Sequence, residues 1–322
     1  MKKNIFNLLG GVLLSLPLLF ASCGNGDNAL EEIINGGGSG GGSSEVTVTE
    51  PYAANEYNEG SWDGTKVIFT KQTAASVTAV ANSDAAVTWD AGWYTVSGNV
   101  TITGNVKLTA DTHLILQDGA TLTINGYLDC LTKGKDLYIY GQKKGDGKLN
   151  VTNNSGNAID SYNHIDIHGG EVTASAAGDY HIGLLPGYLA VYGGKLTATS
   201  GGGEGIGFVN TIDVYGGEVV ATSNATSSAS AFYGIGSGES SASKILKVYG
   251  GKVTATGNGI MDAGDYGSGF GCFVKSGTSG IKFYFSADGT TWGDGTSYTS
   301  DATSVGRKTD DAATQKRYAK AE

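Results

Sequence analysis

The middle of the chain repeats itself, and this repeat limits the possible folds more than any other feature. Each copy contains an alternating apolar stretch that runs into one or two glycines. The copies begin at Leu114, Leu137, Ile165, Leu189, Ile212 and Leu246. Successive copies therefore start 23 to 34 residues apart, and the surplus residues fall in polar segments. A repeat of this length with insertions at fixed places predicts a solenoid.

Every repeat carries three apolar segments. The second follows the glycines and begins at Leu149, Val172, Leu196, Val219 and Val253. The third holds one isoleucine in a glycine-rich setting, and these are Ile159, Ile182, Ile206, Ile235 and Ile260. Because alternate residues of a strand face opposite sides, the apolar positions of all three segments point to one interior. We predict an all-β fold, a parallel β-helix with three short strands per turn, right-handed as crossover connections prefer.

A row of alternating charges gives an independent indication of register. The outward residue that opens the second segment is, in successive copies, Lys148, Glu171, Lys195, Glu218 and Lys252. Parallel strands stack about 4.8 Å apart, so each lysine would lie beside glutamates, and a slip of one turn would bring like charges together. We interpret this row, called the charge ladder below, as a specification of register more than a source of stability.

Composition agrees with short strands and excludes several classes of protein. The 322 residues include 53 glycines, which allow the φ values that sharp corners need, and 3 prolines. Collagen is excluded because no Gly-X-Y period is present. The formal net charge is −10, and the two arginines, Arg307 and Arg317, both lie near the C-terminus. Nucleic acid is not an expected partner, because its phosphates require clustered cations.

The first 22 residues have the pattern of a bacterial export signal. A lysine pair precedes an apolar run, and small residues come directly before Cys23. Residues 19–23, Leu-Phe-Ala-Ser-Cys, resemble the lipobox of bacterial lipoproteins, in which the cysteine is acylated and becomes the mature N-terminus. The alternative is an ordinary secretory signal that is cleaved near Ser22.

Acylation of Cys23 would anchor the protein to a membrane that it does not span. Gly24 follows the cysteine, which in lipoprotein sorting favours the outer membrane of a Gram-negative bacterium. The periplasmic and the surface side both stay open. Residues 23–44 form a Gly/Ser-rich tether, and a flexible coil of this length would hold the folded body on the order of 25 Å from the lipid.

The remaining chain is predicted to be a β-helix with a cap at each end, because solenoid ends expose strand edges. Residues 45–96 contain three of the four tryptophans and are assigned to an N-terminal β cap. Residues 97–275 form the β-helix, and residues 276–322 form the C-terminal cap. Within that cap, Asp288-Gly289 predicts a β-hairpin, and residues 316–322 are expected to add a closing strand.

Two further cysteines, Cys130 and Cys272, are predicted to remain unpaired. An exported protein can form disulfides, so the question has to be decided by distance. The two positions lie about five turns apart, or roughly 24 Å along the stack, whereas a disulfide needs Cα atoms within about 7 Å.

Residues 89–106, residues 116–124, the Tyr/His-Gly-Gly rungs and residues 281–298 resemble a known group of proteins. These are bacterial secreted and lipid-anchored β-helix proteins, often described as carbohydrate-binding domain proteins, with a pectate-lyase-like superfold. Related β-helices include calcium-assisted pectin binders and polysaccharide lyases. The resemblance therefore implies acidic glycans as the ligand class, and Ca²⁺ as the only cofactor to consider. A shared fold does not carry an activity to this chain.

One aromatic residue precedes the glycines in each of five copies, and alternation turns all five outward. These residues are Tyr140, His168, Tyr192, Tyr215 and Tyr249. They form either a strip along which a glycan lies or a stack of neighbouring rings that shields the glycine corner. We name them the aromatic column.

Acidic and histidine side chains near this column are the candidates for catalysis: Asp160, His164, Asp166, His168 and Asp213. Asp166 and Asp213 fall in one column two turns apart, on the order of 10 Å, which is near the carboxylate separation of inverting glycosidases. No third acid completes the array, and the arginine of β-helix pectate lyases has no counterpart before Arg307. We expect no catalysis and no metal site.

The sequence thus predicts a monomeric, lipid-anchored protein of the cell envelope that binds glycans or mediates adhesion through a side face. Two alternatives stay open. One is a polysaccharide lyase or glycoside hydrolase that acts on acidic glycans, and the other is a structural spacer of the envelope.

Overall fold

The computed structural model describes residues 50–225, 233–236, 245–257, 270–286, 288–298, 303–304 and 318–322. All of them belong to the compact unit Glu50–Glu322, so the following description concerns that unit alone. The export signal 1–22, the tether 23–44 with the lipidation site Cys23, and Ile260, Arg307 and Arg317 lie outside the described residues.

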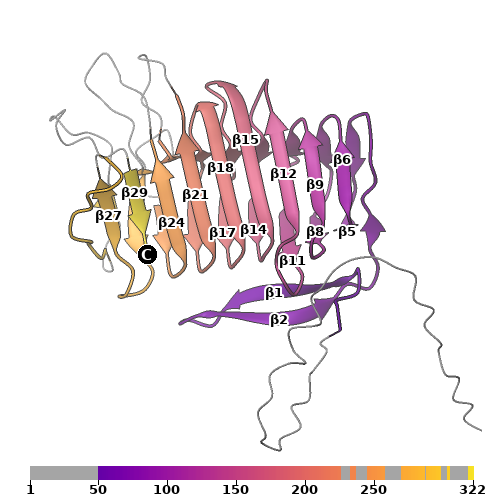
Figure 1. The fold of residues 1–322 in the computed structure, drawn as a ribbon, viewed down its shortest axis with the longest axis horizontal. Coiled ribbons are helices and arrows are strands. Elements are labelled where there is room, and N and C mark those ends of the chain that lie inside the picture. Colours follow the sequence, from indigo (N-terminus) through magenta and orange to yellow (C-terminus); the bar gives the residue numbers. More distant parts are fainter. Residues whose placement is uncertain are drawn as a thin grey trace, which may run out of the picture. The chain divides into compact units, whose positions relative to one another are not determined.

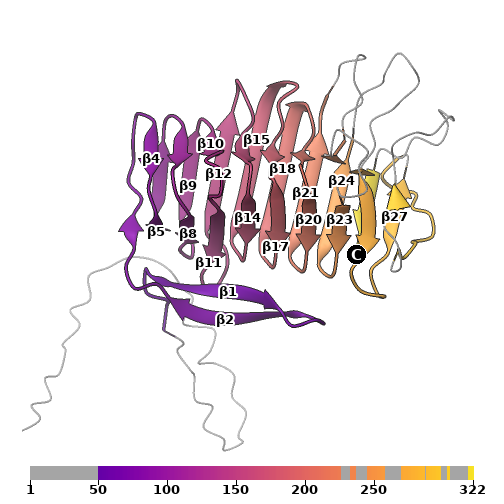
Figure 2. The same ribbon diagram turned by 180° about the vertical axis from the view of Figure 1, so that it is seen from behind.

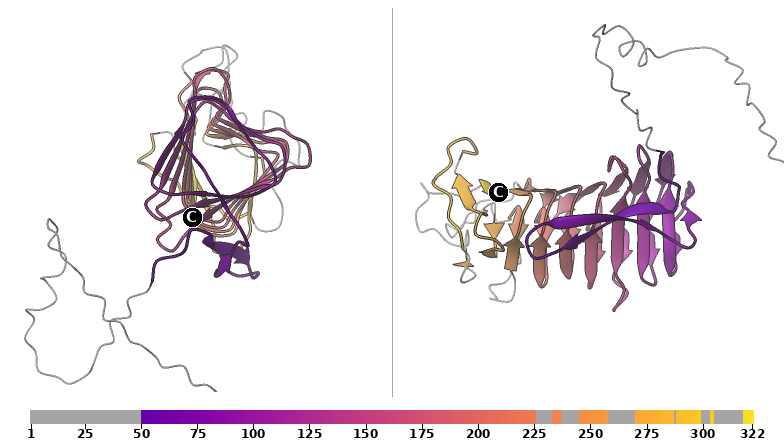
Figure 3. Two further views of the ribbon diagram at one scale, coloured as in Figure 1. Left: turned by 90° about the vertical axis from the view of Figure 1, so that its right-hand side faces the viewer. Right: turned by 90° about the horizontal axis from the view of Figure 1, so that it is seen from below.

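The described residues contain strands and no helix, and the strands wind into a parallel β-solenoid (Figures 1 and 2). Successive triplets, from β4-β5-β6 to β22-β23-β24, place one strand in each of three stacked sheets. Viewed along the stack, the turns superimpose as a three-sided tube (Figure 3). The predicted all-β parallel β-helix is therefore confirmed, whereas its handedness stays a prediction.

The three sheets are named by their number of described strands. The ten-stranded sheet contains, in spatial order, β3 (Thr78–Ala79), β5 (Gly92–Val96), β8 (Thr112–Leu116), β11 (Leu137–Gly141), β14 (His164–Ile167), β17 (Tyr188–Val191), β20 (Thr211–Val214), β23 (Ile245–Val248), β26 (Phe273–Ser276) and β28 (Thr303–Ser304). The nine-stranded sheet contains β6 (Asn99–Ile102), β9 (Thr121–Asn125), β12 (Lys148–Asn153), β15 (Glu171–Asp179), β18 (Lys195–Gly202), β21 (Glu218–Ser223), β24 (Lys252–Thr256), β29 (Tyr318–Ala321) and β27 (Phe283–Ser286). The eight-stranded sheet contains β4 (Val87–Trp89), β7 (Val106–Leu108), β10 (Leu128–Cys130), β13 (Ile159–Ser161), β16 (Leu184–Leu185), β19 (Ile206–Gly207), β22 (Ile235–Gly236) and β25 (Phe270–Gly271).

The core consists of apolar columns that run along the inside of the tube. Leu137 pairs with Ile165, and Leu189 pairs with Ile212, so equivalent residues of successive turns touch. These four side chains are at most 2% exposed. Burial of each such side chain contributes roughly 1.5 to 3 kcal/mol, which makes the inner columns the main source of stability.

One predicted core position is wrong. Ile182 was assigned to the inner column of the eight-stranded sheet, but Leu184 pairs there with Ile159 and with Ile206. The preceding strand β15 contains a register shift between Ala176 and Asp179, and this irregularity displaces the following residues along the turn.

The charge ladder has the predicted register. Glu171 pairs with Lys148 and Lys195, and Glu218 pairs with Lys195 and Lys252, on the outer face of the nine-stranded sheet. Lys148 Nζ lies 2.8 Å from Glu171 Oε2, and Lys195 Nζ lies 3.0 Å from Glu218 Oε2. All four side chains of these pairs are more than a third exposed, so each pair contributes about 0 to 1 kcal/mol.

Both ends of the unit differ in detail from the sequence-based expectation. Residues 87–96, which were assigned to the N-terminal cap, form β4 and β5 of the solenoid itself. At the other end, β27 was expected to form a hairpin around Asp288-Gly289. It pairs antiparallel with β29, and among the described residues the expected hairpin is reduced to one antiparallel bridge, between Phe283 and Thr296. The expected closing strand is present as β29, which lies between β24 and β27.

Cys130 and Cys272 are both buried and unpaired, as predicted. Cys130 belongs to β10 and Cys272 directly precedes β26, so they occupy distant turns of the stack. Burial raises the pKa of the Cys272 thiol to about 12 and also raises that of Cys130, so neither is a reactive thiolate.

Candidate functional site: a groove between a hairpin and the ten-stranded sheet

The aromatic column is a continuous stack of rings on the outer face of the ten-stranded sheet. Ring centroids of successive members are 4.7 to 5.0 Å apart, and neighbouring ring planes differ by 3° to 21°. Each ring between the two ends therefore has both faces covered by its neighbours. A sugar cannot stack on those faces, so the column has the geometry of the stabilising stack rather than of an open strip.

An antiparallel hairpin, β1 (Glu56–Trp62) and β2 (Val67–Thr73), lies across the strands along this column (Figure 3). Tyr57 packs against Tyr140 with centroids 4.5 Å apart. Trp62, further along β1, packs against Tyr215 and Tyr249 at 5.5 and 5.6 Å. The hairpin thus spans several turns and covers one edge of the column.

The hairpin touches the column most closely at Gly60. A Cβ atom on this residue would lie 2.7 Å from the Cβ of Tyr192, so only glycine allows the approach. The Gly60 backbone also meets the imidazole of His168, whose Nδ1 lies 3.1 Å from the amide nitrogen and 3.0 Å from the carbonyl oxygen.

His168 is held in place by contacts on several sides. Its side chain stacks between Tyr140 and Tyr192, and the residue is 7% exposed. Burial lowers its pKa to about 4, so the imidazole is neutral at physiological pH. Neutral imidazole can donate to the Gly60 carbonyl or accept from the Gly60 amide, which fastens the hairpin to the solenoid.

A second outward column runs beside the aromatic column on the same sheet. Strand register places Tyr138, Asp166, Ala190, Asp213 and Lys247 one above another. Asp166 and Asp213 are thus separated by a single rung, about 10 Å at the usual strand spacing, as the sequence predicts.

The two carboxylates are incompletely paired. Oδ1 of Asp166 and Oδ1 of Asp213 are buried and accept no hydrogen bond within the part of the chain that the structure describes. Burial raises the pKa of Asp166 to about 6, and the nearby carboxylate of Asp136 adds to the shift. Burial also raises the pKa of Asp213, although Lys247 Nζ, 3.8 Å from its Oδ1, opposes that shift.

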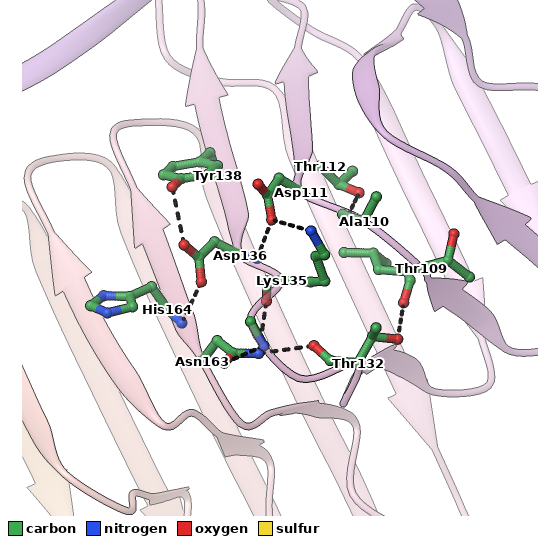
Figure 4. A network of polar contacts seen from close by, with 12 residues as sticks. Thr109, Ala110, Asp111, Thr112, Thr132, Lys135, Asp136, Tyr138, Asn163 and His164 are labelled. Carbon is green, nitrogen blue, oxygen red and sulfur yellow. Dashed lines mark hydrogen bonds and ion pairs between the residues drawn. The ribbon is translucent and has the colours of Figure 1, made fainter.

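Other acids of this face are already engaged, as the polar network in Figure 4 shows. Asp136 accepts hydrogen bonds from the Tyr138 hydroxyl at 3.3 Å and from the backbone N–H of His164 at 3.1 Å. Asp111 accepts from the backbone N–H of Asp136 and lies 3.9 Å from Lys135 Nζ. The His164 ring stacks on Tyr188, with centroids 4.6 Å apart.

Asp160 does not join the other catalytic candidates. It belongs to β13 of the eight-stranded sheet, where its Oδ2 accepts a hydrogen bond from Asn157 Nδ2 at 3.0 Å. The corner at residues 162–163 turns the chain onto another face before His164 and Asp166. Asp160 thus lies in the same turn as the other candidates but on another sheet, away from the aromatic column, and His168 is held by the hairpin.

A groove of about 770 Å³ lies between the hairpin and the ten-stranded sheet. The hairpin lines it with Glu59, Ser61 and Trp62, and the sheet lines it with Tyr138, Asp166 and Tyr192. We call it the hairpin groove. Its volume is typical of sites for small organic ligands, and it combines aromatic side chains with a few polar groups, as such sites do.

The hairpin also borders two smaller spaces, of about 240 and 460 Å³, toward the glycine corners. Glycines and Phe69 dominate their lining, and neither contains an acidic side chain among the described residues. Of these three spaces beside the hairpin, the hairpin groove is thus the one whose described lining combines carboxylates with aromatic side chains.

Sequence reasoning missed the hairpin's contribution to the site. Trp62 was assigned to an end cap, and Tyr57 and Glu59 were not singled out. A glycine within the alternating segment 56–62 was the available signal, because glycine in a strand often marks a close backbone approach.

No protein-family model matches the sequence, and comparisons with curated proteins and with solved structures find no match. The described residues contain no group of three or more His, Cys, Asp or Glu side chains placed to hold a metal ion. A helix long and apolar enough to cross a membrane is also absent from the described ranges.

Proposed function

We propose that the protein binds glycans in the hairpin groove and catalyses no reaction. The observation that carries this proposal is the incompletely paired carboxylate of Asp166, which faces a groove of about 770 Å³ among aromatic side chains. Sugar hydroxyls are hydrogen-bond donors, and buried carboxylates without partners are strong acceptors. The edges and hydroxyl groups of Tyr138 and Tyr192 supply apolar and polar contacts beside it.

The same proposal includes the location of the protein in the cell. The lipobox-like segment at Cys23 and the Gly/Ser-rich tether support a lipid-anchored protein of a Gram-negative outer membrane, with its β-solenoid held away from the lipid. The Tyr-Gly-Gly rungs support membership of the carbohydrate-binding β-helix group that they resemble.

Two observations favour binding over catalysis, although the Asp166–Asp213 pair keeps its predicted spacing. Asp160 lies on a different sheet from Asp166, and the imidazole of His168 is occupied by Gly60. A polysaccharide-degrading enzyme and a structural spacer are therefore left as outcomes of the test.

A glycan array with the full chain, run with and without a calcium chelator, tests the proposal. A matched pair of variants identifies the site. Ser61→Trp fills the groove from the hairpin, whereas Thr152→Trp adds the same bulk at an exposed position of the nine-stranded sheet.

We expect Ser61→Trp to lose at least tenfold in affinity for the retained glycans and Thr152→Trp to keep it within twofold. No retention of any glycan, or equal retention by Ser61→Trp and the unmodified protein, would overturn the proposal. Shortened glycans after incubation would show an enzyme instead.

A further inference from the structure

Two acidic side chains flank one alanine on the outer face of the ten-stranded sheet, and one of them, Asp166, also lines the hairpin groove. Ala190 pairs with Asp166 on one side and with Asp213 on the other, so only the small side chain of Ala190 separates the two in this column. Tyr188 in β17 and Tyr192 directly after it lie two residues to either side of Ala190. We call this arrangement of Asp166, Ala190 and Asp213 the acidic notch.

The dimensions of the acidic notch suit a small cation. Neighbouring parallel strands lie about 4.8 Å apart, so a group above Ala190 is about 5 Å from each flanking strand, within reach of an aspartate side chain. The ring faces of Tyr192 are covered by His168 and Tyr215, which leaves carboxylates as the main attraction in the notch. Tyr188 is 39% exposed, so its end of β17 is accessible to solvent.

The groups around the acidic notch are mostly negatively charged. Glu59 of the hairpin lines the adjoining groove, and neither lysine nor arginine lines it within the described part of the chain. Lys247 neutralises part of the charge at Asp213 from the far side, at 3.8 Å. No salt bridge reaches Asp166 among the described residues, and only the interaction with His164 favours its charged form. Unlike charges attract strongly where solvent is partly excluded.

Burying these two carboxylates lowers the stability of the folded protein when no ligand is bound. A charge that is buried without full pairing destabilises the folded state. The Asp213 side chain keeps an exposed fraction of 26% even though its Oδ1 is buried, so a ligand has access to the rest of the group. A cation that bound between Asp166 and Asp213 would offset the cost of both.

The following inference rests on the proposed glycan-binding function. We propose that the bound glycan carries a free amino group, as in a hexosamine that is not acetylated. The ammonium of this amino group occupies the acidic notch between Asp166 and Asp213. Uronic acids would meet Glu59 and Asp166 with like charge and be repelled. The ligand class therefore differs from the acidic glycans that the sequence resemblance implies.

Pairs of oligosaccharides that differ only in acetylation test this inference. Hexamers of glucosamine and of galactosamine, each with its fully N-acetylated counterpart, are titrated calorimetrically against the full chain near pH 6 at constant salt, with a galacturonate hexamer alongside. We expect at least one amino hexamer to bind tenfold or more tightly than its acetylated counterpart, and the galacturonate hexamer to bind more weakly than both.

Three variants locate the effect. Asp166→Asn and Asp213→Asn should each weaken binding of the amino hexamer about tenfold. Asp213→Asn should change binding of the acetylated hexamer by less than twofold, because Asp213 does not line the groove. Asp166→Asn also removes an acceptor for sugar hydroxyls, so it should weaken binding of the acetylated hexamer as well, but less than that of the amino hexamer. Glu218→Gln removes the same charge from the nine-stranded sheet and should change neither. This control separates the acidic notch from a general attraction of a polycation to an acidic protein.

The outcomes for the two proposals are distinguishable. Equal or tighter binding of the acetylated hexamers overturns the amino-group inference and leaves glycan binding in the groove intact. Equal losses in Asp166→Asn and Glu218→Gln also overturn the inference, because the attraction would then be general. Failure of every hexamer and of every glycan on the array overturns both proposals.

Discussion

Gly60 and His168 are joined through the imidazole Nδ1 although they lie 108 positions apart in the sequence. This contact holds the β1–β2 hairpin on the aromatic column and thereby forms one wall of the hairpin groove. The missing side chain of Gly60 is essential to it, because a Cβ would meet Tyr192 at 2.7 Å.

Gly60→Ala should release the hairpin from the solenoid. We expect the free energy of unfolding to fall by about 1 to 3 kcal/mol because the added methyl overlaps Tyr192. Hydrogen exchange should show lost amide protection in residues 56–73 and little change in β14 and β17. Gly280→Ala is the control, since a Cβ there meets nothing within 4 Å. Unchanged protection of the hairpin in Gly60→Ala would contradict the close contact.

Asp166→Asn should stabilise the protein in a manner that depends on pH. Burial raises the pKa of Asp166 to about 6 in the folded state, against about 4 in an unfolded chain. The carboxyl is protonated in both states below about pH 4, and the folded state loses stability as the pH rises through 6. The variant has no charge to bury, so its advantage over the unmodified protein should grow by about 1 to 3 kcal/mol between pH 4 and pH 7.

Thermal unfolding at several pH values measures this difference. The charged groups around Asp166 are His164 on its own strand, Asp136 next to the neighbouring strand β11 and Glu59 on the hairpin, and all are retained in both proteins. Asp63→Asn is a control of opposite sign, because backbone N–H groups of Lys66 and Thr65 lower the pKa of Asp63. That variant should lose relative stability as the pH rises. A pH-independent effect of Asp166→Asn would contradict the burial of its charge.

Replacing a corner glycine by alanine should lower the free energy of unfolding by different amounts at two corners. Gly119 and Gly194 both have positive φ, at +72° and +75°. A Cβ on Gly119 meets nothing within 4 Å, whereas a Cβ on Gly194 would collide with the backbone carbonyl oxygen of Gly170 on the preceding turn. Gly119→Ala should therefore cost about 1 kcal/mol of backbone strain, and Gly194→Ala about 3 kcal/mol or more. Denaturant unfolding compares the two, and equal costs would contradict the close stacking of corners.

The repeat explains why so much of the tube was predictable from the sequence. Once successive copies stack, a position in one copy lies on the same position of the next, so the register of Glu171 and Lys195 follows from their places in the repeat. The stack of Tyr192 on Tyr215 follows in the same way. The core position of Leu184 was not predicted, because the register shift in β15 changes the number of residues between equivalent positions in that turn.

The groove was not predictable by this route. The hairpin belongs to no repeat, and nothing in its spacing relates Tyr57 or Trp62 to a particular turn of the solenoid. Its docking depends on ring contacts and on the fit of Gly60 against Tyr192, which are properties of folded surfaces. Asp160 was misplaced for a related reason, because a corner of two residues decides which sheet the next side chain joins.

Lys195→Glu tests the charge ladder. The new glutamate would lie beside Glu171 and Glu218, so we expect a loss of about 0.5 to 1 kcal/mol at low salt. Most of this loss should disappear in 1 M salt, where the screening length falls to about 3 Å. Lys133→Glu, at an exposed corner, makes the same change in net charge and should cost less. A loss that persists in high salt would indicate a disturbance of packing instead.

Hydroxyl-radical footprinting of the full chain, with and without the glycan that it retains most strongly, tests the binding site most directly. We expect protection of Trp62, Tyr138 and Tyr188, which border the groove and the acidic notch. Tyr162 and Tyr180, which are 63% and 61% exposed at other places on the tube, should be modified equally in both samples. Protection of Tyr162 or Tyr180 with none at Trp62 and Tyr138 would contradict the assignment of the ligand to the hairpin groove.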